Sequence, residues 1–176
     1  MCSPIIRGED LIGLNQHKNI FRKEHQIVDI LIDTLMHNDN MFNAIALNTE
    51  FDYSEGKPDV VIVNKQGDII TFEAKLSKWK KAGQQAYRNT SFSHFSYVMM
   101  PTSSMNKVRK HLDYFKERNV GLVFIEEDGI IIYSEAQRCE PLRPVLTERA
   151  REHVLDEGKI IHERGGSSVN SGGDLS

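Results

Sequence analysis

The chain has 176 residues, of which 27% are charged and 39% are hydrophobic, the composition of an ordinary soluble domain. No apolar run approaches the roughly 20 residues of a membrane-spanning helix, and residues 1–7 lack the apolar centre of a signal peptide. We therefore expect a cytoplasmic protein with no membrane partner. The two cysteines, Cys2 and Cys139, show no metal-ligand spacing, and we expect both to be free thiols.

Charge is unevenly distributed along the chain. The net charge is −3, yet the stretch from Lys75 to Arg118 carries ten Lys and Arg residues against two acids, Asp113 and Glu117. A basic middle in an acidic chain is typical of a localised surface for a polyanion. Two solvated helix surfaces would explain the same run of charge equally well.

Helical periodicity follows an N-terminal arm. Apolar residues recur at Ile20, Ile27, Leu31 and Leu35, the spacing of one buried helix face. Glu24 lies on that stripe, where a carboxylate is costly unless it is paired or binds a metal ion. The alternative is that Glu24 stands at the exposed start of the helix, where an acid suits the helix dipole.

A first strand is predicted to run from Ala44 to Tyr53. Glu50 alternates against the apolar residues of this strand, so it faces the other side and is a second candidate for an additional metal-binding acid. We favour a solvated Glu50. Pro58 then begins the next strand, where its missing N–H does least harm.

The next segment predicts an antiparallel hairpin. Two apolar runs rich in β-branched residues, 60–63 and 69–72, flank five residues typical of a turn. A turn centred near Gln66 pairs Val63 with Ile69. Continued away from the turn, that register places two acids opposite each other.

Those acids are Asp59 and Glu73, and directly opposed residues have Cβ atoms about 4.5–5.5 Å apart. Lys75 lies two residues beyond Glu73, so its side chain leaves the same face. One interpretation is a solvated hairpin end with a surface ion pair. The other is a Mg²⁺ site, in which hard oxygen ligands hold the ion and the lysine acts on a water molecule.

A helix is predicted to begin at Lys78, with Ser77 as its N-cap. Its packing face is expected to comprise Trp79, Ala82, Ala86 and Tyr87. A neighbouring face, which would overlook the hairpin end, carries Lys78, Lys81 and Gln85.

Three more strands are expected at Phe95–Pro101, Val120–Ile125 and Ile130–Tyr133, with a helix over 108–119 between the first two. The order is therefore helix, three strands, helix, strand, helix and a final strand pair. It predicts an α/β fold in which a mixed central β-sheet is flanked by helices.

At the hairpin the residues resemble a known family. Pro58-Asp59, a spacer and Glu73-Ala74-Lys75 are similar to the motif of the PD-(D/E)xK nuclease superfamily, which has a restriction-endonuclease-like αβββαβ core. The resemblance covers roughly residues 18–135. It implies a Mg²⁺-dependent nuclease, with Mn²⁺ as a substitute, that hydrolyses phosphodiester bonds of DNA as an endonuclease rather than an exonuclease. Many relatives dimerise, so a homodimer is compatible with it.

The resemblance also implies roles at the site. Asp59, Glu73 and the backbone carbonyl of Ala74 would hold the metal ion, and Lys75 would orient or deprotonate the attacking water. Many relatives carry a Glu on the first helix that joins the metal site, which assigns Glu24 as a ligand, directly or through water.

Nucleic-acid contacts are implied for the helix that follows the hairpin. Its candidates are Lys78, Lys81, Gln85 and Arg88. One branch of the superfamily carries Gln-x-x-x-Tyr on this helix, a spacing that neither Gln84 nor Gln85 has. Phosphate contacts of this kind position a substrate without reading its sequence.

We expect four segments along the chain: an arm at 1–17, the nuclease-like core at 18–138, a linker and short helix at 139–164 and a disordered tail at 165–176. The alternative function is a catalytically inactive nucleic-acid- or protein-binding module on the same fold. A serine hydrolase is disfavoured because the chain contains no Gly-x-Ser-x-Gly turn.

Overall fold

The computed structural model describes residues 20–37 and 41–161. Their elements, in chain order, are α1 (Glu24–His37), β1 (Ala44–Asn48), β2 (Val60–Asn64), β3 (Ile69–Ala74), α2 (Trp79–Asn89), β4 (Phe95–Pro101), the 3-10 turn η2 (Thr102–Ser104), α3 (Met105–Val108), the 3-10 turn η3 (Arg109–His111), α4 (Leu112–Lys116), β5 (Gly121–Glu126), β6 (Gly129–Ser134), α5 (Pro144–Glu157) and β7 (Lys159–Ile160). The predicted arm at 1–17 and tail at 165–176 lie outside the described residues.

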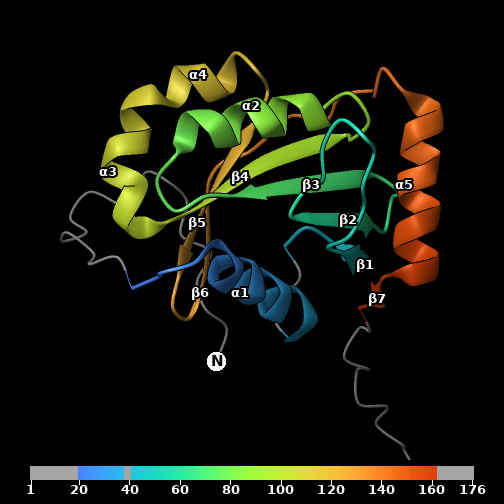
Figure 1. Ribbon diagram of the computed structural model, residues 1–176, viewed down its shortest axis with the longest axis horizontal. Coiled ribbons are helices and arrows are strands. Elements are labelled where there is room, and N and C mark those ends of the chain that lie inside the picture. The colour runs from blue at the N-terminus through green and yellow to red at the C-terminus, as the bar shows by residue number, and fades with distance from the viewer. Residues whose placement is uncertain (1–19, 38–40, 162–176) are drawn as a thin grey trace, which may run out of the picture.

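These residues form one seven-stranded mixed sheet in the order β6-β5-β4-β3-β2-β1-β7, an α/β fold as predicted (Figure 1). The central pairs β3–β4 and β4–β5 are parallel, and the outer pairs are antiparallel. A parallel pair needs a crossover connection, which α2 supplies between β3 and β4. None of the described helices is long and apolar enough to cross a bilayer.

The predicted hairpin is present as β2 and β3, in the predicted register: Val63 pairs with Ile69. The turn depends on two local features. Gly67 adopts a positive φ of 80°, which glycine reaches without steric cost. Asn64 Oδ1 accepts a hydrogen bond from the Asp68 N–H (2.8 Å) and so closes the loop.

The two faces of the sheet are covered by different helices (Figure 1). On one face, α1 packs its buried stripe against Phe72 and its neighbours on β4 and β5. On the other face, α2 to α4 cover β4 and β5, and α5 covers β1 to β3. Because side chains alternate along a strand, Phe72 faces α1 and Glu73 points to the α2 side.

Several predicted boundaries differ from the structure. The first helix begins at Glu24, and Ile20 is 50% exposed ahead of it. The first strand ends at Asn48. The chain then turns through Ser54, which has a positive φ, so that Phe51 packs beneath α5 instead of continuing the sheet.

Ser77 does not cap α2, because Lys78 occupies the N-cap position and makes no side-chain cap bond. The helix predicted over 108–119 is divided into α3, η3 and α4. At the break, His111 has φ −119° and ψ 24°, outside the helical region, and its ring stacks on Trp79 of α2. This contact between distant segments cannot be seen in the local periodicity.

The segment after residue 138 contributes to the same sheet and core. α5 begins at Pro144, where a proline is favoured in the first helical turn, within the segment predicted as a linker and short helix. Thr147 is buried, and its hydroxyl donates a hydrogen bond to Phe92 O (2.7 Å). β7 then pairs with β1 at the edge of the sheet.

Candidate active site

Asp59 lies one residue ahead of β2 and is tied to the end of β3. Its N–H donates to Phe72 O (3.1 Å), and its Oδ2 accepts a hydrogen bond from the Ala74 N–H (2.7 Å). Asp59 therefore bonds to the residues on both sides of Glu73, one position beyond Val60 and Phe72, the last pair of the β2–β3 ladder. The Asp59 side chain keeps 33% of its surface exposed, so it remains open to a ligand.

Glu73 is almost fully buried beneath α2, with 2% of its surface exposed. Asn89, the last residue of α2, donates a hydrogen bond from Nδ2 to Glu73 Oε1 (2.8 Å). The Tyr53 hydroxyl in turn donates to Asn89 Oδ1 (2.9 Å). This chain of two hydrogen bonds fixes the amide of Asn89 and, through it, the orientation of the Glu73 carboxylate.

Burial raises the pKa of Glu73 from 4.5 to about 7, against the hydrogen bond from Asn89, which lowers it. The Asp59 charge raises this pKa further, because two nearby carboxylates repel each other. Lys75 and Arg88 oppose the shift but do not cancel it. Burial is the largest cause, so Glu73 holds its proton more tightly than an exposed glutamate does.

Lys75 is largely buried, and its ammonium group contacts the end of β3, the start of α1 and the residue ahead of β2. Nζ lies 2.6 Å from Ala74 O, 2.9 Å from Glu24 Oε2 and 3.9 Å from Asp59 Oδ2. Glu24 is the first residue of α1 and 51 positions away in sequence. Both expectations for Glu24 are therefore met in part: it stands at the exposed helix start, and it also reaches the site, where its partner is Lys75.

The donor atoms of the site bear on whether it could hold a metal ion. Within residues 20–37 and 41–161, no three His, Cys, Asp or Glu side chains gather in an arrangement that could hold one. Asp59, Glu73 and the Ala74 carbonyl nevertheless offer hard oxygen donors, which fit Mg²⁺ or Mn²⁺. The Lys75 ammonium already contacts two of these three residues, so an ion bound there would have to displace it in part.

The other sequence candidates occupy varied positions. Lys78, Lys81 and Arg88 are exposed on α2. Gln85 is half-buried, and its Oε1 is shielded from solvent with no hydrogen-bond donor among the described residues. Glu50 is exposed, as favoured, and no contact places it at the site.

Sequence reasoning missed Asn89 and Tyr53. Both lie far from Glu73 in the chain, by 16 and 20 positions, and neither belongs to the motif. Asn89 had one signal, because a polar residue at the end of the apolar face of α2 is expected to need a partner when buried. Tyr53 had none, because the strand predicted to contain it ends at Asn48, and its hydroxyl meets Asn89 only in the folded chain.

Replacing Asn89 with Ala is expected to destabilise the chain by about 1–3 kcal/mol, because it leaves Glu73 Oε1 and the Tyr53 hydroxyl without their buried partner. Urea unfolding followed by circular dichroism measures the change. Gln84→Ala, at an exposed position of the same helix, is the matched control. Equal stability of the Asn89 and Gln84 variants would show that the hydrogen-bonded chain contributes nothing.

Comparison with known proteins gives the fold alone. No family model matches the chain, and no curated protein matches it. A solved structure of similar fold is the SPO1766 protein of unknown function from Silicibacter pomeroyi, with a TM-score of 0.54 and 15% identity over 82% of this chain and 99% of that one. At this identity the similarity supports the arrangement of the sheet and helices and says nothing about activity.

Proposed function

We propose that this chain is a Mg²⁺-dependent nuclease with a restriction-endonuclease-like core, which hydrolyses phosphodiester bonds of nucleic acid, DNA in particular. The observation that carries the proposal is the grouping of Asp59, Glu73, the Ala74 carbonyl and Lys75 at one end of the β2–β3 hairpin. A binding module has no need to crowd two carboxylates where a phosphate must approach. The PD-(D/E)xK resemblance of the same residues supports the assignment.

Each residue has a distinct role in this proposal. Asp59, Glu73 and the Ala74 carbonyl would hold the ion, which when bound lowers the pKa of a coordinated water and neutralises charge on the phosphate. Lys75 would position that water as an ammonium, or take its proton when present as the neutral amine, since its Nζ lies beside Asp59 and Ala74 O. Glu24 holds Lys75 in place from the other side.

Cleavage of a panel of single-stranded, duplex and closed circular DNA and RNA, with Mg²⁺, Mn²⁺ or EDTA, tests the proposal. We expect metal-dependent cuts within closed circles, the sign of an endonuclease. Lys75→Ala should abolish cleavage without weakening Mg²⁺ binding, because Lys75 is not a ligand and its ammonium competes with the ion for Asp59 and Ala74 O. Full cleavage by Lys75→Ala would refute the mechanism.

A non-catalytic module on the same fold remains the alternative, and one observation favours it. The Lys75 ammonium already donates hydrogen bonds to Ala74 O and Glu24 Oε2. It could therefore supply the positive charge of the site in place of a metal ion. Calorimetric titration with Mg²⁺ separates the two functions. A chain that binds no Mg²⁺ at millimolar concentration, and whose nucleic-acid binding is independent of the ion, would be the module.

A further inference from the structure

The solvent-facing side of α2 is basic. Successive residues of a helix are rotated by about 100° about its axis, and this places five residues of α2 on one side. All five are exposed, and we call them the α2 basic face: Lys80, Lys81, Gln84, Tyr87 and Arg88. No Asp or Glu occurs anywhere between Glu73 and Asp113. The face therefore carries three cations with no acid of its own helix to neutralise them.

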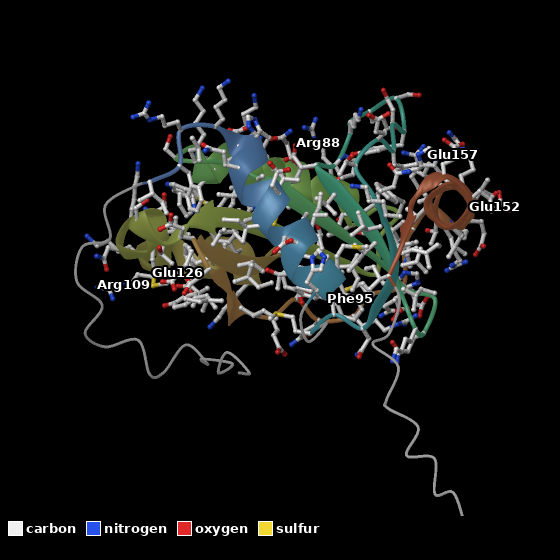
Figure 2. The ribbon with its side chains drawn as sticks, turned by 90° about the horizontal axis from the view of Figure 1, so that it is seen from below. Arg88, Phe95, Arg109, Glu126, Glu152 and Glu157 are labelled. Carbon is white, nitrogen blue, oxygen red and sulfur yellow. The ribbon has the colours of Figure 1, made fainter. Side chains whose placement is uncertain are left out.

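Figure 2 shows Arg88 at an edge of the molecule along which several nitrogen-tipped side chains project outward. Glu152 and Glu157 lie on α5, away from that edge. The three cations of the α2 basic face thus form a local positive patch on the exposed side of this helix. A polyanion approaching the molecule would be drawn to the α2 side.

Tyr87 is the unexpected member of this face. Its spacing predicted a packing role, but 54% of its surface is exposed, and it is the one aromatic side chain of the described residues in the exposed class. Exposing a large ring to water forgoes the burial free energy that drives aromatic residues into cores. A partner that covers the ring would recover it.

Tyr87 also lies at the end of α2 that meets the site. Arg88 follows it directly, and the Arg88 charge acts on the Glu73 carboxylate. Asn89, one residue further, bonds to Glu73. A nucleotide strand held across Arg88 would therefore have its neighbouring base within reach of Tyr87 while a phosphate lies near the site.

The other aromatic residue of α2 is not available in this way. Trp79 stacks on His111 with ring centroids 4.3 Å apart and meets Tyr114 edge to face. Arg118 in turn lies over the Tyr114 ring. These rings join α2 to α4, so Tyr87 is the ring that the face presents to solvent.

We propose that the α2 basic face binds single-stranded nucleic acid, with an unpaired base stacked on Tyr87 and backbone phosphates on Lys80, Lys81 and Arg88. Base–aromatic stacking tolerates any sequence, whereas the bases of a duplex are already stacked on one another and offer no free face to the ring. The inference rests on the proposed nuclease function and adds the form of its substrate, a single strand.

Fluorescence anisotropy in EDTA tests it without cleavage. The probes are a labelled oligothymidylate, an oligouridylate of equal length and a hairpin duplex. We expect the wild-type chain to prefer the single strands, and Tyr87→Ala to weaken their binding about tenfold or more with the duplex changed less than twofold. Tyr87→Phe should bind as the wild type does, because stacking needs the ring and not the hydroxyl.

Val145→Ala is the matched control, because Val145 is 77% exposed on α5, away from the face. Thermal melting of each variant confirms that it is folded. Unchanged single-strand binding by Tyr87→Ala, or equal losses for strand and duplex, would overturn the proposal. Because no metal is present, these outcomes are independent of the cleavage test: a chain that binds strands through Tyr87 but never cuts them would refute the nuclease function alone.

Discussion

Asp59→Asn is expected to lower Mg²⁺-dependent cleavage by about a hundredfold to a thousandfold while the fold is retained. The change removes one negative oxygen from the proposed ion site, and electrostatic groups of this kind contribute about a hundredfold to a thousandfold each to catalysis. The Asn side chain can still accept the hydrogen bond from the Ala74 N–H, which the Asp59 carboxylate accepts at 2.7 Å. Loss of activity can therefore be separated from loss of structure.

The measurement is the single-turnover cleavage rate with saturating Mg²⁺, alongside the urea midpoint of each variant. Glu50→Gln is the matched control, since it removes an exposed acid that makes no contact with the site. Asp59→Asn should also weaken Mg²⁺ binding in calorimetry, whereas Lys75→Ala should not. An Asp59→Asn enzyme that cuts at the wild-type rate would mean that the chemistry lies elsewhere.

Glu73 is expected to make the metal-free chain lose stability as pH rises. Its pKa is raised from 4.5 to about 7 in the folded state, so folded Glu73 binds its proton more tightly than unfolded Glu73. The stabilising contribution is present below about pH 4.5 and is lost as pH rises through 7. A shift of this size corresponds to about 3 kcal/mol of unfolding free energy.

The difference between wild type and Glu73→Gln isolates this effect from other titrating groups. In EDTA, Glu73→Gln should become the more stable of the two as pH increases from 5 to 8, because Gln accepts the Asn89 hydrogen bond without a charge. Mg²⁺ should restore the wild type at pH 8 and leave the variant nearly unaffected. A difference that stays constant with pH would show that Glu73 is ionised without penalty.

The residues that define the candidate site could be found from the sequence because they follow local rules. β-branched runs and a glycine turn fix the β2–β3 register, and that register brings Asp59 beside Glu73 whatever the rest of the chain does. The buried strand ending at Pro101 was predicted with its observed bounds for the same reason. Lys75 lies one residue beyond β3, and its ammonium meets Glu24 of α1 whereas Glu73 bonds to Asn89 of α2, so alternation along β3 does not account for where the ammonium lies.

The tertiary structure alone decided what surrounds these residues. Glu24 meets Lys75 across 51 positions, and Tyr53 meets Asn89 across 36, because α1 and α2 pack on opposite faces of the sheet at the end of β3. The exposure of Tyr87 depends on the rotation of α2 about its axis. Helical periodicity shows which residues share a side of a helix, but the sheet and α4 determine which side is buried, since many weak contacts from distant segments are optimised together.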